Sequence, residues 1–243
     1  MDLYTLYGIS VGTGDPELIT LKGLRLLQQA RVVAFPAGKG ARPGVAQTII
    51  SDWLKPEQKT LKLNFPYVCE EAILQQAWHT AARQVWQCLQ HGDVAFACLG
   101  DVSLYSTFTY LAQTLRQLAP ETQIKTVPGV CSPVAIASEL NIPLTVNHQR
   151  LAILPAIYSV AEFETVLTWA NVVVLLKVNS VYPQVWQLLK AKNLLEHSWV
   201  VEKATFPDQK IYANLARFPQ LKLSYFALLL VANDKNTDYS SVY

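Results

Sequence analysis

The sequence predicts an α/β fold with two α/β domains, and three observations indicate it. Strand-like apolar runs alternate with helical stretches in the first half of the 243-residue chain. Three turns, rich in glycine or small residues, each follow a strand-like run and lead toward a helical one. Strand-like runs then succeed one another near the carboxyl end. We expect an amino-terminal domain over residues 1–127 and a carboxyl-terminal domain over residues 128–243.

The first half predicts a mostly parallel, five-stranded sheet with helices on its faces. Apolar residues recur every four positions from Ile73 to Leu89, which predicts one apolar helix face, and the apolar run after this helix is typical of a buried parallel strand. The strands that can be located cover residues 4–11, 32–35, 94–99 and 124–127, and the helices cover an amphipathic stretch up to residue 29 and residues 70–90 and 107–118.

The second half predicts a mixed sheet with helices. A helix of small residues over 132–140 follows Pro128-Gly129, and Pro143 then opens a polar stretch. The three last strand-like runs have no helix between them, so we expect part of this sheet to be antiparallel. The predicted strands cover residues 151–154, 172–177, 199–202, 211–214 and 225–232, and the predicted helices cover residues 161–169 and 181–191.

Composition and charge argue for a small-molecule partner. The formal net charge is +2, from 20 Lys and Arg against 18 Asp and Glu, and the basic residues form no cluster. We therefore expect no binding to nucleic acid. The amino end carries no leader-like apolar segment, and no later run has bilayer-spanning length without a charge or a turn. A cytoplasmic protein without a membrane partner is the expectation.

The cysteines and histidines indicate neither a metal site nor a disulfide framework. Cys69, Cys88, Cys98 and Cys131 form no C-x-x-C pair, and the four histidines fall at no spacing typical of metal ligands. We expect buried thiols in a reducing compartment and no bound metal.

The first motif is a glycine-rich turn between the first strand and the first helix, residues 8–22, GISVGTGDPELITLK. Gly12 and Gly14 allow positive φ and a close approach of a ligand to the backbone. Either Asp15, which precedes a proline, or Thr20 could cap the helix that follows. The turn is neither a G-x-G-x-x-G dinucleotide fingerprint nor a Walker A loop.

Two further motifs follow strands. Residues 98–107, CLGDVSLYST, come directly after a buried strand, and residues 127–132, VPGVCS, open onto the helix of small residues. Ligands of open parallel sheets bind beyond the carboxyl ends of the strands, so Asp101 is the carboxylate to examine first. An Asx-turn or a helix cap is the structural alternative for Asp101.

The ordered set of these three motifs closely resembles the tetrapyrrole (corrin and porphyrin) methylases. The likeness continues through residues 32–36, 173–178, 201–205 and 225–231, so it covers nearly the whole chain. Within the family, the GDVSLYST form of the second motif is most similar to methyltransferases that act on C20 of precorrin-2 or cobalt-factor II. Ser10, Thr13 and Cys131 depart from the residues usual at those positions, which are glycine, proline, and serine or threonine.

The resemblance implies a site for S-adenosyl-L-methionine (SAM) in a cleft between the two domains, bound largely by backbone groups. Lys177 fits least well, because its ammonium would repel the sulfonium of SAM unless the side chain turns toward a substrate carboxylate. Carried over by motif position, the cofactor contacts are Thr13, Leu99, Gly100, Asp101, Leu104, Cys131, Ser132, Lys177 and Ala204.

The implied reaction is transfer of a methyl group from SAM to C20 of the ring in cobalamin biosynthesis, which asks for positioning rather than for a catalytic triad. Asp101 is our candidate for the base that accepts the C20 proton. Lys39, Arg42 and Arg150 are candidates for binding the substrate carboxylates, although each has a solvated surface role as its alternative.

Two other functions stay open from the sequence. One is a related methylase that acts at another ring position or on RNA, and the other is a noncatalytic protein that binds SAM or a tetrapyrrole. The family resemblance also implies a homodimer.

Overall fold

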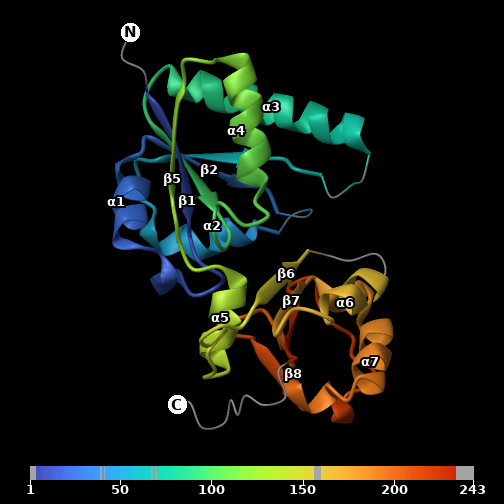
Figure 1. Cartoon of the computed structure of the whole chain (residues 1–243). Coiled ribbons are helices and arrows are strands. Elements are labelled where there is room, and N and C mark those ends of the chain that lie inside the picture. Colours follow the sequence, from blue (N-terminus) through green and yellow to red (C-terminus); the bar gives the residue numbers. More distant parts are fainter. Residues whose placement is uncertain are drawn as a thin grey trace. The chain divides into compact units, whose positions relative to one another are not determined.

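The computed structural model describes residues 4–38, 40, 42–66, 68, 70–155 and 160–233. Residue contacts divide the chain into two units, Met1–Cys131 and Ser132–Tyr243. Each unit holds one five-stranded sheet with helices packed on it (Figure 1), which confirms the predicted α/β class. The domains expected over residues 1–127 and 128–243 stay a prediction.

The sheet of the first unit is entirely parallel, with the strand order β3-β2-β4-β1-β5. Its centre is fully buried, because every residue of β4 lies in the core. Its strands are β1 (Thr5–Ser10), β2 (Val32–Pro36), β3 (Lys59–Leu63), β4 (Val94–Cys98) and β5 (Gln123–Val127).

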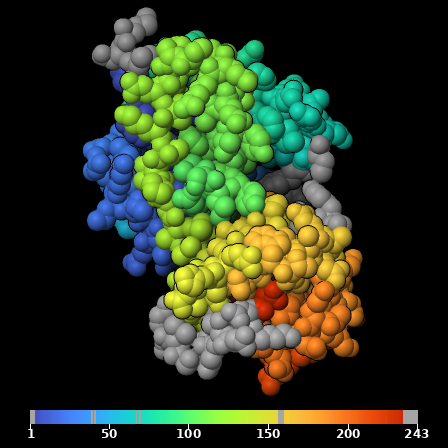
Figure 2. Space-filling view, in the orientation of Figure 1, coloured from blue at the N-terminus to red at the C-terminus, as the bar shows by residue number. Residues whose placement is uncertain are grey.

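Helices cover both faces of this sheet, as parallel strands require. Helices α1 (Leu21–Gln29) and α2 (Val45–Ile50) bury Leu27 and Ile50 in one core. Helices α3 (Glu71–Leu89) and α4 (Thr107–Leu118) bury residues of their own in a second core on the other face. Helices α3 and α4 also pack against each other and lie side by side at the surface (Figure 2).

Asp15 and Thr20, the two candidate caps at the first turn, each cap a helix. The Asp15 side chain accepts a hydrogen bond from the Glu17 N–H and caps a short 3-10 helix, Pro16–Leu18. The Thr20 hydroxyl accepts from the Gly23 N–H and caps α1. The amphipathic stretch that we predicted up to residue 29 is therefore two helical segments rather than one.

The second sheet is mixed, with the strand order β6-β7-β10-β8-β9. Strands β6 and β7 are parallel, whereas β10 runs antiparallel to both β7 and β8, and β9 antiparallel to β8. The partly antiparallel sheet was predicted. Its strands are β6 (Leu151–Leu154), β7 (Val172–Leu176), β8 (Ser198–Glu202), β9 (Lys210–Ala213) and β10 (Ala227–Ala232).

Helices α6 (Val160–Val166) and α7 (Tyr182–Ala191) form one core with this sheet, and α5 (Ser132–Glu139) contacts β10. The Trp186 indole N–H donates to the Leu215 carbonyl at 2.7 Å, so this buried polar group is satisfied. Short 3-10 helices connect the elements at Ser51–Trp53, Val178–Ser180, Leu195–His197 and Leu215–Arg217. No helix in the described part of the chain combines the length and apolarity needed to cross a bilayer.

Two elements of the first unit had no counterpart in the sequence prediction. Strand β3 lies at the edge of the sheet, and of its five residues only Leu63 is buried. Helix α2 is six residues long. An exposed edge strand and a short helix both lack the extended apolar pattern on which such a prediction depends.

Candidate functional site

Three turns meet at the carboxyl-terminal edge of the first sheet. Strands β4, β1 and β5 are parallel neighbours, so the turns that follow them lie at one edge. We call residues 11–15, 99–106 and 128–131 the three-turn site. The predicted residues that it contains are Thr13, Leu99, Gly100, Asp101, Leu104 and Cys131.

Two backbone hydrogen bonds join the first two turns. The Val11 N–H donates to the Cys98 carbonyl at 2.9 Å, and the Gly100 N–H donates to the Gly12 carbonyl at 2.6 Å. Both glycines have positive φ, 78° at Gly12 and 70° at Gly100. A Cβ on Gly12 would lie 2.7 Å from Leu18 Cβ, whereas a Cβ on Gly100 would meet nothing within 4 Å. The backbone at Gly100 therefore borders open space.

The Asp101 carboxylate links the second turn to the third turn and to the end of β1, directly before the first turn. Its Oδ1 accepts hydrogen bonds from the Ser103 N–H at 2.8 Å and from the Ser103 hydroxyl. Its Oδ2 accepts from the Gly129 N–H at 2.8 Å and from the Ser10 hydroxyl at 3.4 Å. Asp101 thus makes the Asx-turn that was the structural alternative, and in addition it holds the ends of β1 and β5 together.

These hydrogen bonds also set the charge of Asp101. Burial by itself raises the pKa of Asp101, but the hydrogen bonds from Ser103, Gly129 and Ser10 outweigh burial and hold the pKa below its ordinary value. A carboxylate with a lowered pKa is a weaker base. The base role that we predicted for Asp101 stays a prediction, and the geometry favours a positioning role.

Ser10 and Gly129 fit each other closely across the site. The Ser10 hydroxyl oxygen accepts a hydrogen bond from the Val102 N–H at 2.8 Å, and the side chain is fully buried. A Cβ on Gly129 would lie 2.5 Å from Ser10 Cβ, closer than real side-chain carbons come. The serine at position 10 therefore requires glycine at position 129.

The end of the second turn is fixed to α4. The Ser106 hydroxyl accepts from the Phe108 N–H at 3.0 Å and caps α4, while the Cys98 thiol sulfur lies 2.8 Å from the Ser106 oxygen. Burial raises the pKa of the Cys98 thiol to about 11, so the thiol stays protonated and acts as a packing group. Tyr105, directly before the cap, has a left-handed φ of 51° and is 57% exposed.

The two predicted cofactor residues Lys177 and Ala204 follow β7 and β8 in the second unit. These strands are both antiparallel to β10, so they are parallel to each other and end at one edge of the second sheet. Lys177 has a left-handed φ of 56°. Ala204 is buried and lies between Lys203 and Thr205, which also have positive φ.

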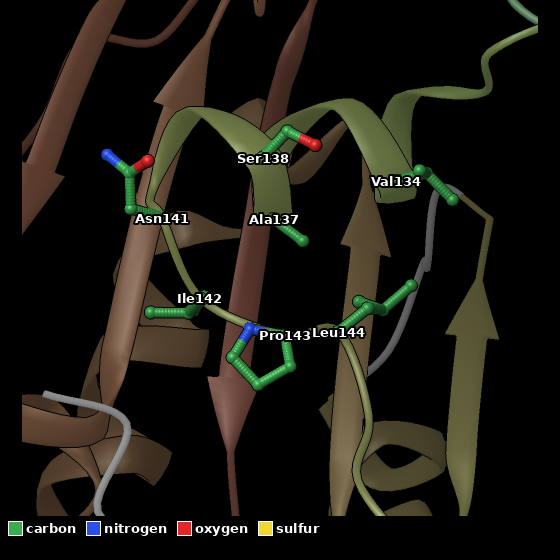
Figure 3. Close-up of a pocket in the computed structure, with 7 residues that line it drawn as sticks. All are labelled: Val134, Ala137, Ser138, Asn141, Ile142, Pro143 and Leu144. Atoms are coloured by element: carbon green, nitrogen blue, oxygen red, sulfur yellow. The ribbon is translucent and has the colours of Figure 1, made fainter. Parts of the chain in front are cut away.

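Ser132 is the first residue of α5, and one face of this helix borders an open pocket of about 400 Å³ (Figure 3). The pocket contains none of the predicted site residues. Its polar side chains, Ser138 and Asn141, are exposed, so no buried polar group marks a ligand there. Its lining consists of Val134, Ala137, Ser138, Asn141, Ile142, Pro143 and Leu144.

Two of the three candidate cations fall among the described residues. Lys39 lies outside the described residues, and Arg42 is exposed. Arg150 directly precedes β6, which is parallel to β7, so Arg150 lies at the opposite edge of the second sheet from Lys177. No group of His, Cys, Asp and Glu that could hold a metal ion occurs among the described residues.

Sequence reasoning missed several partners that build these sites. Ser10 was noted only as a departure from the resembling family, and Ser103 and Gly129 were not connected with Asp101. Tyr225 and Glu202, at the edge of the second sheet, were assigned to strands. A serine or glycine at the end of an apolar strand is the one signal that could have pointed to the partners of Asp101.

Comparison with known proteins gives one family and several near full-length relatives. Residues 5–219 match the Tetrapyrrole (Corrin/Porphyrin) Methylases. The cobalt-precorrin-2 C(20)-methyltransferase of Salmonella typhimurium is 30% identical, over 97% of this chain and 98% of the relative. The precorrin-2 C(20)-methyltransferase of a Sinorhizobium species is 28% identical, over 95% of this chain and 96% of the relative.

Solved structures of similar fold also include methyltransferases. The X-ray structure of the cobalt precorrin-4 methyltransferase CbiF has a TM-score of 0.69 and 25% identity, over 95% of this chain and 96% of that chain. The uroporphyrin-III C-methyl transferase of Thermus thermophilus, complexed with S-adenyl homocysteine, has a TM-score of 0.63 and 20% identity, over 94% of this chain and 97% of that chain. The likeness to the second structure concerns the fold alone.

The contact between Ser10 and Gly129 predicts a rescue. We expect Gly129→Ala to lower the free energy of unfolding by about 1–3 kcal/mol, because the added carbon overpacks against Ser10 Cβ. In a Ser10→Gly background, the same substitution should cost much less. Urea unfolding of the wild type, both single variants and the double variant gives the coupling energy. Equal costs in both backgrounds would contradict the contact.

The lowered pKa of Asp101 predicts a pH-dependent contribution to stability. A folded-state pKa below the unfolded value, about 3.9, gives stability that is present above that pH and is lost as pH falls through the folded pKa. We expect the wild type to exceed Asp101→Asn in thermal unfolding midpoint at pH 7, with the difference shrinking below about pH 4. The effect is small because Asp101 is partly exposed. A difference that does not change with pH would contradict this prediction.

Proposed function

Because this chain belongs to the tetrapyrrole (corrin/porphyrin) methylases, we propose that it transfers the methyl group of SAM to C20 of precorrin-2 or of its cobalt form, cobalt-factor II, in cobalamin biosynthesis. The observation that carries the proposal is the near full-length relation to C(20)-methyltransferases, with 97% of this chain matched at 30% identity. The three-turn site supports it, because it lies where ligands of parallel sheets bind. A cytoplasmic homodimer is part of the same proposal.

The residues of the three-turn site fit SAM. A ligand bound largely by backbone groups needs turns that it can approach closely, and Gly100 provides such a place, since nothing lies within 4 Å of its missing Cβ. In this proposal Thr13, Leu99 and Gly100 bind SAM together with Asp101, Leu104, Cys131, Ser132, Lys177 and Ala204. A structural relative of the same fold was crystallised with S-adenyl homocysteine.

The chemistry asks the protein mainly for positioning. SAM supplies an electrophilic methyl group, and the reduced ring supplies a nucleophilic carbon. Holding the two in line replaces a bimolecular encounter, which is worth roughly 7–11 kcal/mol of the barrier. The hydrogen bonds of Asp101 serve this end, because they fix the three turns relative to one another. Whether Asp101 also accepts the C20 proton is tested by the turnover of Asp101→Asn.

Methyl transfer is the direct test. The purified protein is incubated without oxygen with methyl-labelled SAM and either precorrin-2 or cobalt-factor II, and the product is analysed by mass spectrometry and carbon NMR. We expect a gain of one methyl group at C20 with at least one of the rings. The ratio of kcat/KM for the two rings shows which metal state is preferred.

The controls separate the other functions. Methylation at a different carbon would identify a relative with another ring specificity, and an RNA acceptor in parallel tests the ribose alternative. Tight binding of SAM in calorimetry without transfer to any acceptor would overturn the proposal in favour of a binding protein.

Gly100 provides a test of the SAM site with a matched control. We expect Gly100→Ala to weaken SAM binding at least about tenfold, which corresponds to about 1.4 kcal/mol, because the new methyl group enters the space that the ligand needs. Gly40 has a similar φ of 65°, and a Cβ there would likewise meet nothing within 4 Å. Gly40→Ala therefore carries a similar backbone penalty and should leave the Kd for SAM unchanged in calorimetry. Equal effects of both variants would argue against SAM at Gly100.

A further inference from the structure

The carboxyl-terminal edge of the second sheet brings together three segments. Lys177 follows β7, Lys203 follows β8, and Tyr225 precedes β10. The Lys203 N–H donates to the Phe226 carbonyl at 3.0 Å. The Lys177 ammonium lies 4.9 Å from the centre of the Tyr225 ring. The segment before β10 is therefore held between the ends of β7 and β8.

The two lysines at this edge differ in their partners. The Lys203 ammonium forms an ion pair with Asp208. No carboxylate of the described residues lies within 4.0 Å of the Lys177 ammonium, which faces the Tyr225 ring instead. An aromatic ring attracts a cation but leaves its charge uncompensated. Lys177 therefore keeps a positive charge that an incoming anion can neutralise.

The backbone at Lys177 adds a second observation. Its φ of 56° is left-handed, a conformation that costs energy for any residue with a side chain other than asparagine or aspartate. Glycine or asparagine would adopt it more readily. Such strain in an ordered turn suggests that the side chain serves a purpose at this position.

The segment that carries Tyr225 is fixed by contacts of its neighbours. The Glu202 carboxylate, 6% exposed, accepts a hydrogen bond from the Ser224 N–H at 2.6 Å and one from the Tyr212 hydroxyl at 3.2 Å. The Tyr225 ring also meets the Phe226 ring edge-on, with centroids 5.3 Å apart. These contacts hold the backbone on one side of Tyr225 and pack a ring against the Tyr225 ring, which faces the Lys177 ammonium.

We propose that Lys177 and Tyr225 form a binding site for a peripheral carboxylate of the tetrapyrrole acceptor. The inference rests on the proposed function and deepens it. An ammonium offers three donors, so it can hold a carboxylate on the side away from the ring. SAM also has one carboxylate, but its sulfonium and amino group carry positive charge that the Lys177 ammonium repels. The backbone of residue 177 remains open to a contact with SAM, while the side chain serves the acceptor.

Lys190 provides a matched control. Its ammonium lies 5.5 Å from the Trp186 ring, so it makes the same kind of lysine–aromatic pair, but on α7 rather than at the end of a strand. Lys177→Met and Lys190→Met each remove one such lysine. A general effect of lost charge or lost stacking would appear in both variants.

The first arm of the test uses turnover and SAM binding. For Lys177→Met we expect the KM for precorrin-2 or cobalt-factor II to rise about tenfold or more, as for the loss of a hydrogen bond between charged groups. The Kd for SAM should stay unchanged in calorimetry, and added salt should change the KM less than it does in the wild type. Lys177→Arg should restore most of the affinity, and Lys190→Met should behave as the wild type.

The second arm uses an equilibrium probe that needs no turnover. Uroporphyrin III, a fluorescent tetrapyrrole with carboxylates around its ring, is titrated into the wild type, Lys177→Met and Lys190→Met. Weaker binding by Lys177→Met alone supports the inference even if the wild type methylates neither proposed ring, an outcome that would overturn only the proposed function. An unchanged Kd for uroporphyrin in Lys177→Met, or a matching rise in its Kd for SAM, would overturn the inference.

Discussion

The Asp101 carboxylate is the interaction on which the three-turn site depends. Its two oxygens accept hydrogen bonds from the segment after β4, from the turn after β5 and from the last residue of β1. None of these donors is a cation, so the negative charge is stabilised by fixed dipoles that need no further partner. Together with the two backbone hydrogen bonds between the first two turns, these contacts hold the three turns as one surface for a ligand.

The second sheet uses a buried carboxylate in the same way. Glu202 ends β8, and its oxygens accept from the Ser224 N–H and the Tyr212 hydroxyl. Ser224 lies in the segment that joins β9 to β10, so one side chain connects the end of a strand with a distant turn. In both units, then, an acid at the carboxyl end of a strand orders the loops beside a candidate binding edge. These two carboxylates stabilise the structure, and in the proposed function the reacting groups belong to SAM and the ring.

The sequence allowed much of the fold to be predicted, because apolar periodicity is strong in buried elements. Helix α4 and strand β6 were predicted to the residue, and the mixed character of the second sheet followed from three strands in succession. Strand β3 was missed because its polar residues face solvent at the edge of the sheet.

The candidate site was predictable only in outline. Motif positions located Asp101 and Gly100, since turns after buried parallel strands are where ligands bind. The partners of Asp101 were not predictable in this way, because Ser10 is 91 residues away from it in the chain. The same holds for Lys177 and Tyr225, which meet through the packing of strands that no local pattern encodes.

The central position of β1 has a consequence for how the chain folds as it is synthesised. Strand β1 pairs with β4 and β5 and not with β2 or β3, which follow it sooner in the chain, and the Thr5 N–H donates to Asp93, 88 residues later. At roughly 5–20 residues per second, the first strand waits several seconds with both hydrogen-bonding edges unpaired. An apolar strand in that state is exposed to pairing with other chains. Production of this protein should therefore be sensitive to translation rate and to chaperones that shield nascent strands.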